Sequence, residues 1–104
     1  MYALEKRPET GLLAGLWQFP NVTGRLQTEQ SLETVEKMGL RPRELTKIIE
    51  RKHIFTHIIW KMQGIYLEVA EPSGNFRWMT AAEIRETAAL PTAFRQFFEE
   101  ADYV

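Results

Sequence analysis

The two histidines, His53 and His57, are the first residues whose type and spacing could do chemistry. They stand four positions apart, and on a helix that spacing would direct both imidazoles to one face, where they could bind zinc. The residues between them, Ile54-Phe55-Thr56, belong to a β-rich stretch and include no Glu, which a helical zinc-protease motif requires. We therefore expect no metal site at this pair.

Other catalytic groupings are equally scarce in this sequence. It has no Cys, which excludes disulfides, thiolate metal ligands and cysteine nucleophiles. It has no Gly-rich phosphate loop and no nucleophile elbow. The carboxylate pairs Glu33 with Glu36 and Glu99 with Glu100 have spacings at which acidic residues usually form a solvated helix face. No catalytic residue is predicted in this chain.

Length and composition are typical of one globular domain. The chain has 104 residues, 44% of them hydrophobic and 26% charged, and its formal net charge is -1. We expect a single domain over residues 1–104. The apolar runs are too short to cross a bilayer, and the N-terminus lacks the apolar core of a signal peptide. A cytoplasmic, nucleoid-associated location and no membrane partner are therefore expected.

Positive charge is concentrated in residues 41–61, which hold six basic and two acidic residues. Such a segment is typical of a surface that binds nucleic acid, because Lys and Arg displace the counterions condensed on phosphates. The alternative is a solvated strand whose basic residues oppose edge-to-edge aggregation.

Hydrophobic periodicity predicts an α+β fold of about five strands and three helices. Strands are expected at residues 2–6, 16–19, 45–55, from 58 onward, and 76–79. In the fourth strand the apolar alternation changes phase at Gly64, which predicts a β-bulge or a strand break there. The alternation also assigns Trp60 to the core, and we expect the same of Trp17 and Trp78.

The three helices are predicted from end signals and apolar stripes. The first is expected between a cap at Thr28 or Ser31 and a left-handed Gly39. The second, over residues 80–88, opens with a capping-box pattern. The third has Pro91 at its first position. Its apolar stripe comprises Ala93, Phe94, Phe97, Phe98 and Ala101.

Three motifs then occur in a recognisable order. The first joins Glu5-Lys6-Arg7-Pro8 to Gly11-Leu12-Leu13-Ala14-Gly15-Leu16-Trp17-Gln18-Phe19-Pro20, the second is His53-Ile54-Phe55-Thr56-His57, and the third is Leu90-Pro91-Thr92-Ala93-Phe94. Together they resemble the C-terminal domain of MutY-type adenine DNA glycosylases over essentially the whole chain. The resemblance implies a Nudix-like fold, similar to the pyrophosphatase MutT, in which helices flank a mixed β-sheet.

The resemblance also implies a function, namely recognition of 8-oxoguanine paired with adenine in duplex DNA. In that family the removal of adenine and a 4Fe–4S cluster belong to an N-terminal catalytic domain, which would be this domain's partner in the same polypeptide. No cofactor is expected in the present domain. The family's lesion-sensing loop reads Phe-Ser-His and corresponds here to Phe55, Thr56 and His57, while Arg51 and Lys52 would contact phosphates beside it.

Each of these residues also has a purely structural explanation. Phe55 could pack in the core, Thr56 could bond its own backbone, and His57 could be an ordinary turn residue. Arg51 and Lys52 could keep a strand soluble. Thr in place of Ser preserves a hydroxyl that donates and accepts, although its extra methyl stiffens χ1.

The helix around Glu33 resembles the metal-binding box of Nudix pyrophosphate hydrolases with part of its ligands missing. Aligned on Gly39, it keeps Glu33 and Glu36, but Lys37 and Gly24 stand where two further acids belong. A hard cation needs several carboxylate oxygens at once, so no metal is expected here. A divergent nucleotide pyrophosphatase is one alternative function, and a protein-interaction domain is another.

The first strand carries a further expectation. A Nudix-like sheet normally pairs residues 2–6 with strand residues ahead of Tyr2, which are missing from this sequence. An open edge near Tyr2–Lys6 is therefore expected, and with it self-association through that edge.

Overall fold

The computed structural model describes residues 1–87 and 90–101, and over these it confirms the predicted α+β class. Its strands are β1 (Tyr2–Lys6), β2 (Trp17–Gln18), β3 (Pro42–Ile54), β4 (Ile59–Val69) and β5 (Arg77–Met79). Its helices are α1 (Thr28–Lys37), α2 (Ala81–Thr87) and α3 (Thr92–Ala101). The five strands and three helices of the described residues agree with the number expected.

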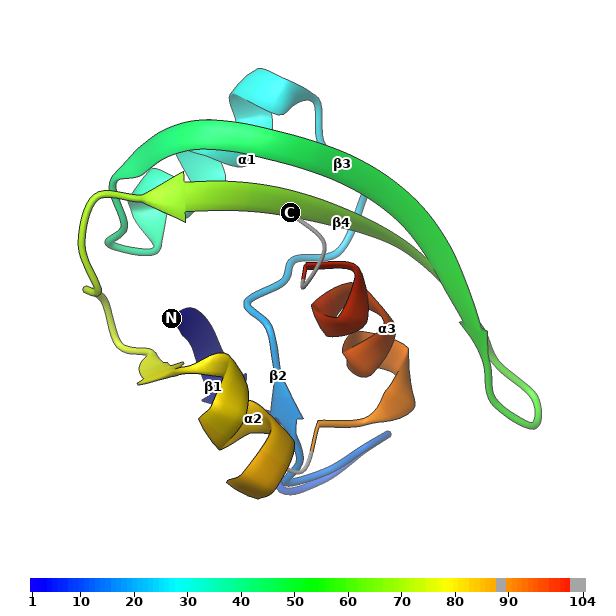
Figure 1. Ribbon diagram of the computed structural model, residues 1–104. Helices are drawn as coiled ribbons and strands as arrows, with labels where there is room; N and C mark the ends of the chain where they lie inside the picture. The colour runs from blue at the N-terminus through cyan, green and yellow to red at the C-terminus, as the bar shows by residue number, and fades with distance from the viewer. Residues whose placement is uncertain (88–89, 102–104) are drawn as a thin grey trace.

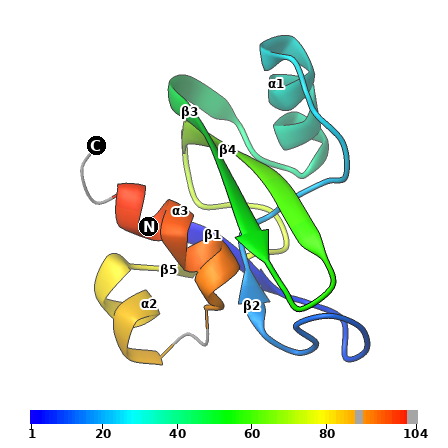
Figure 2. The same cartoon turned by 90° about the vertical axis from the view of Figure 1, so that its right-hand side faces the viewer.

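A long antiparallel hairpin of β3 and β4 dominates the molecule. It arches over α3, while α1 lies on its outer side (Figure 1). The view turned by 90° also places α1 and α3 on opposite sides of the hairpin (Figure 2). The remaining strands form a small antiparallel sheet in the order β2-β1-β5, which packs with α2 below α3.

The core lies between this small sheet, α2 and α3. Its buried side chains are Leu4, Met79, Ile84, Leu90, Phe94 and Phe98. The apolar stripe predicted for the last helix is confirmed, because Ala93, Phe94, Phe97 and Phe98 are all buried. Trp17 and Trp60 are half-buried against this core. The half-buried Trp78 donates its indole N–H to the Ser73 carbonyl at 3.0 Å and is not among the side chains packed against this core.

The open edge expected at β1 is found only in part. β1 lies between β2 and β5, with Tyr2, Ala3 and Leu4 paired to β5 and Glu5 and Lys6 paired to β2. Each residue of the strand is thus paired on one side only, and self-association through the remaining side has no support from the structure.

Helix ends follow the predicted signals in part. Gly39 has a φ of +87° just beyond α1, as expected of a residue in the left-handed C′ position. The N-cap of α1 is Gln27 rather than Thr28 or Ser31, and the Gln30 side-chain oxygen accepts its N–H at 2.8 Å. A glutamine can supply this acceptor because its amide reaches back along the first turn.

The capping box of α2 is confirmed, whereas the start of α3 differs from the prediction. Thr80 donates its N–H to Glu83 at 3.1 Å, and the Glu83 N–H donates to the Thr80 hydroxyl at 3.2 Å. Ala88, the expected end of α2, lies outside the described residues. Pro91 precedes α3 instead of opening it, and its carbonyl accepts the Arg95 N–H at 2.8 Å.

The bulge or break predicted at Gly64 is wrong. β4 is continuous through it, and Ile48↔Ile65, Ile49↔Gly64 and Glu50↔Gln63 pair in unbroken register. The shifts in register lie elsewhere, between Pro42 and Glu44 and between Leu45 and Lys47.

The change of phase has another cause, which is that the two faces of the hairpin are covered by different elements. Trp60, Met62 and Gly64 face α3 and the core. Strand alternation places Ile65 and Leu67 on the other face, the outer side of the hairpin on which α1 lies (Figure 1). In a strand that is buried first on one face and then on the other, the alternation of apolar residues shifts by one position even though the strand is continuous.

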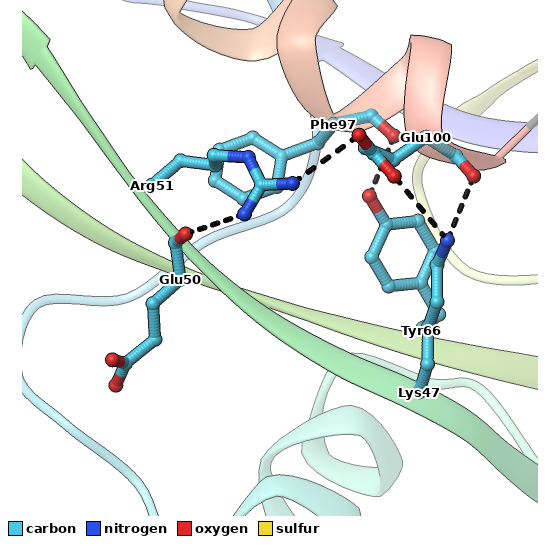
Figure 3. Close-up of polar contacts among 6 residues, drawn as sticks. All are labelled: Lys47, Glu50, Arg51, Tyr66, Phe97 and Glu100. Atoms are coloured by element: carbon cyan, nitrogen blue, oxygen red, sulfur yellow. Dashed lines mark hydrogen bonds and ion pairs between the residues drawn. The ribbon is translucent and has the colours of Figure 1, made fainter.

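Four polar side chains fasten α3 to the concave face of the hairpin (Figure 3). The Tyr66 hydroxyl donates to the Phe97 carbonyl at 2.6 Å, and the Lys47 ammonium donates to the Glu100 carbonyl at 2.7 Å. Arg51 forms an ion pair with the Glu100 carboxylate at 3.2 Å. These contacts use backbone carbonyls near the end of α3 and hold the helix at a fixed angle under the arch.

We predict that Gly64→Ala destabilises the fold by about 1–3 kcal/mol, because an added methyl overpacks a filled space. A Cβ at Gly64 would lie 2.4 Å from a Phe97 ring carbon. Urea denaturation measures the loss. Gln63→Ala, on the opposite face of β4, is the control and should change stability by no more than about 0.5 kcal/mol.

A double-mutant cycle identifies the cause of that loss. Gly64→Ala combined with Phe97→Ala should cost less than the sum of the two single changes, because the truncated ring makes room for the methyl. Additive costs would contradict the steric explanation.

Alkaline pH should weaken the attachment of α3. Burial, aided by the Glu100 carboxylate and opposed by Arg51, raises the pKa of Tyr66 from 10.0 to about 12. Between these values the unfolded chain releases this proton and the folded chain keeps it, so the free energy of unfolding falls as pH rises. The stability of the parent chain relative to Tyr66→Phe should therefore decline between about pH 10 and about pH 12 in urea denaturation. A parent chain and a Tyr66→Phe variant whose stabilities stay parallel across this range would contradict the explanation.

Candidate nucleic-acid interface

The tip of the β3–β4 hairpin projects from the body of the molecule (Figure 1). The Phe55 N–H donates to the Ile58 carbonyl at 2.7 Å and closes a short loop between the strands. Thr56 and His57 stand at its apex, and both are exposed. The structure thus presents a hydroxyl and an imidazole together at the most protruding end of the hairpin.

Phe55 is half-buried and its ring is held by two neighbours. The ring centroid lies 4.7 Å from that of His53 and 5.0 Å from that of Trp60, both in edge-on geometry. Trp60 in turn lies 5.9 Å from Phe94 of the core. The stack His53–Phe55–Trp60–Phe94, which we call the aromatic bracket, connects the apex of the loop to α3. Edge-on pairs of this kind are favourable beyond their buried area, which stiffens the loop.

Arg7 fastens the aromatic bracket from the other side. Its guanidinium lies 5.2 Å from the Trp60 ring centroid and 6.0 Å from that of Phe94. The same group donates to the Gln18 side-chain oxygen at 2.7 Å and to the Leu12 carbonyl at 3.0 Å. Arg7 therefore ties the loop of residues 7–16 to the base of the hairpin tip, and both lie at the same end of the molecule (Figure 2).

Sequence reasoning included Arg7 in a motif but assigned it no role. The signal that could have identified it is a charged residue beside a run of apolar residues, since a guanidinium stacks on aromatic rings. His53 was considered only as a metal ligand, whereas in the structure it braces Phe55.

Arg51 and Lys52 lie on opposite faces of β3. Arg51 faces α3, where it pairs with Glu100 and donates to the Glu50 carbonyl at 2.8 Å. Lys52 is exposed and lies directly opposite Lys61 of β4. Arg51 is already engaged with Glu100, whereas the exposed Lys52 has no ion-pair partner among the described residues. The structure brings Lys52 near the loop apex on one face and holds Arg51 on the other.

The residues of α1 do not fit a divalent metal. Glu33 and Glu36 are exposed on the helix and Lys37 follows them. Within residues 1–87 and 90–101 there is no group of three or more His, Asp or Glu that could hold an ion. Two solvated carboxylates beside an ammonium group do not supply the oxygen ligands that Mg²⁺ requires. His53 and His57 likewise form no such group.

The part of the chain that the structure describes contains no helix long and apolar enough to cross a membrane.

Comparisons with known proteins agree with the motifs. A family described as NUDIX domain matches residues 1–100. Adenine DNA glycosylase of Homo sapiens is 36% identical over 107 residues, which cover 91% of this chain and 19% of that protein. The Rattus norvegicus protein of the same name is 35% identical, with 91% and 20% covered. That of Arabidopsis thaliana is 35% identical over 101 residues, with 83% and 16% covered.

The resemblance inferred from the three motifs is therefore confirmed. The chain spans about a fifth of the length of the human and rat relatives that it matches, at 19% and 20%.

Phe55→Ala should destabilise the chain by about 1–3 kcal/mol, because it removes two ring contacts and half-buried apolar area. Thermal unfolding measures the loss. Ile54→Ala, the exposed neighbour on β3, should stay within about 0.5 kcal/mol of the parent. Equal effects of the two changes would show that the aromatic bracket contributes nothing to stability.

Proposed function

The chain belongs to the NUDIX domain family, and from this premise we propose that it is the lesion-recognition domain of a DNA repair glycosylase that removes adenine paired with 8-oxoguanine. The observation that carries the proposal is the exposed Thr56–His57 apex, held rigidly by the aromatic bracket at the end of the hairpin. The relatives named adenine DNA glycosylase support DNA as the partner and adenine as the base that is removed.

The chemistry of the lesion explains why a hydroxyl belongs at this position. Oxidation at C8 turns N7 of guanine from a hydrogen-bond acceptor into a donor and adds an acceptor oxygen at C8. The Thr56 hydroxyl can accept from the N7–H of the oxidised base. Normal guanine offers only an acceptor at N7, so the hydroxyl would have to turn and donate to it. The contact therefore discriminates when the Thr56 O–H is committed to another acceptor. One such contact discriminates by about 1–3 kcal/mol.

The structure favours different roles for the three residues of the loop. For Phe55 to stack on a base, its ring must first leave His53 and Trp60. We therefore assign the direct base contact to Thr56 and a phosphate or base contact to His57. Phe55 presents these two residues, and Lys52 contributes a phosphate contact from the exposed side of β3.

The proposed domain binds and does not catalyse. The relatives are about five times longer than this chain, and we propose that removal of adenine, together with a 4Fe–4S cluster, belongs to another domain of the same polypeptide. Within this division the present domain prolongs residence at the oxidised strand while the other domain extracts the base. A cytoplasmic, nucleoid-associated location would suit this work.

Thr56→Val tests the proposal because it keeps the β-branched shape and removes only the hydroxyl. The ratio of affinities for duplexes containing 8-oxoguanine:A and G:A, measured by fluorescence anisotropy at low salt, should fall by about tenfold. Thr56→Ser keeps the hydroxyl and should retain the ratio.

Two outcomes would contradict the proposal. One is a parent chain that binds both duplexes equally. The other is a ratio that Thr56→Val leaves unchanged. Release of pyrophosphate from 8-oxo-dGTP with Mg²⁺ would instead favour a nucleotide hydrolase.

A further inference from the structure

The outer face of the hairpin tip carries isoleucines that the fold leaves uncovered. Ile54 is 61% exposed, Ile59 57% and Ile58 47%. Ile54 and Ile59 are direct cross-strand partners at the last pair of the ladder. Side chains of such a pair stand about 5 Å apart, so the two form one continuous apolar surface. Packing of the core does not require apolar side chains at these positions, because the core lies on the opposite face of β4.

A pair of lysines borders the isoleucines. Lys52 and Lys61 are the cross-strand pair two residues farther from the tip, and both are exposed. Residues two apart in a strand share a face, so the lysines lie beside Ile54 and Ile59. Like charges directly opposite each other destabilise a sheet. Among the residues that the structure describes, the ion pairs join other side chains and none neutralises this pair.

The apolar pair and the lysine pair together define the chemistry of the occupant. It must present negative charge to Lys52 and Lys61 and, about 7 Å farther along the strand, apolar edges to Ile54 and Ile59. Duplex DNA does both, because phosphates flank grooves whose floors and sugar edges accept apolar side chains. The neighbouring apex of Thr56 and His57 already points to DNA in the proposed function.

We propose that this outer face, consisting of Ile54, Ile59, Lys52 and Lys61 and continued by the exposed loop residue Ile58, is a second DNA-contact surface that does not read the lesion. The isoleucines lie against the groove beside the base that Thr56 contacts, and the two lysines bind flanking phosphates. This proposal rests on the proposed function for its partner. Apart from Lys52 it assigns different residues, and it assigns them a different task, which is affinity rather than discrimination.

Isoleucine methyl NMR of the whole chain tests the contact directly. The chain has seven isoleucines, and Ile48 is 41% exposed on the same face of β3 but six residues from Ile54. Titration with undamaged duplex at low salt should shift the methyls of Ile54, Ile58 and Ile59 and leave Ile48 unshifted. Equal shifts at Ile48, or no shifts at the three tip residues while the duplex binds, would overturn the proposal.

Matched variants measure the contribution to affinity. Ile54→Thr with Ile59→Thr should weaken binding of 8-oxoguanine:A and G:A duplexes alike, by about tenfold, because burial of two apolar side chains is lost. Ile48→Thr is the control and should bind as the parent does. All three Ile→Thr substitutions keep the β-branched shape that strands prefer.

The lysines are tested by salt. Lys52→Gln with Lys61→Gln should reduce the slope of log affinity against log salt concentration by about 2, since each phosphate contact contributes about 0.9. Arg43→Gln, an exposed basic residue at the other end of β3, should leave the slope unchanged. An unchanged slope in the lysine variant would overturn the phosphate contacts.

These measurements separate failure of this proposal from failure of the proposed function. If the parent prefers the oxidised duplex and the isoleucine variant loses no affinity, the outer face is not a DNA surface although the function stands. If the parent shows no preference but the isoleucine and lysine variants still bind more weakly, the outer face binds DNA and lesion recognition is wrong. Concentration-dependent dimers abolished by Ile54→Thr with Ile59→Thr would assign the face to a second copy and overturn the proposal.

Discussion

The position of the hairpin tip depends on close contact between β4 and α3. Gly64 lets the ring of Phe97 lie against the strand backbone, at a distance that no side chain would permit. The Tyr66 hydroxyl and the Lys47 ammonium then bind carbonyls of the same helix at 2.6 and 2.7 Å. A two-stranded ribbon is only marginally stable alone in water, so its curvature and direction must come from what it packs on. Here it packs on a helix that is itself anchored in the core by Phe94 and Phe98.

Beyond that contact, the loop is held in place by a series of packed aromatic rings rather than by the hydrogen bonds between the two strands. Phe94 belongs to the core, Trp60 lies against it, and Phe55 lies against Trp60. Arg7 fills the side of this stack and brings the loop of residues 7–16 to the same end of the molecule. An apex held in this way loses little further conformational entropy on binding, which is the advantage of a preorganised recognition loop. Phe55 thus fixes the position of the loop, and its polar neighbours Thr56 and His57 remain exposed to contact a ligand.

Much of this arrangement could be predicted from sequence, and the exceptions have physical causes. The alternation of apolar residues located the strands, the Thr80–Glu83 pattern located the cap of α2, and Gly39 located the turn after α1. These features could be predicted because they depend on neighbouring residues alone. Gly64 was misinterpreted as a bulge because a phase change in the apolar alternation has two possible causes, a bulge or a change in which face of the strand is covered. Only the contact with Phe97, which lies far away in sequence, distinguishes them. Three features were missed. The place of β1 between β2 and β5 and the role of Arg7 depend on residues distant in sequence. The Gln27 cap depends on a side chain that simple cap rules omit. In the candidate site, the motif located Phe55, Thr56 and His57, but not which of them face solvent.

The division of charge across the hairpin explains why the basic segment cannot act as a single patch. Lys47 and Arg51 point inward and are engaged with Glu100, whereas Lys52 and Lys61 point outward beside exposed isoleucines. The inward cations stabilise the fold and are screened from a ligand by their partner. Of these four cations, the outward pair has no ion-pair partner among the described residues and is the pair better placed to release counterions when a polyanion binds. A net charge summed over residues 41–61 therefore overstates the number of phosphate contacts, and alternation along β3 is what decides which basic residues are available for DNA.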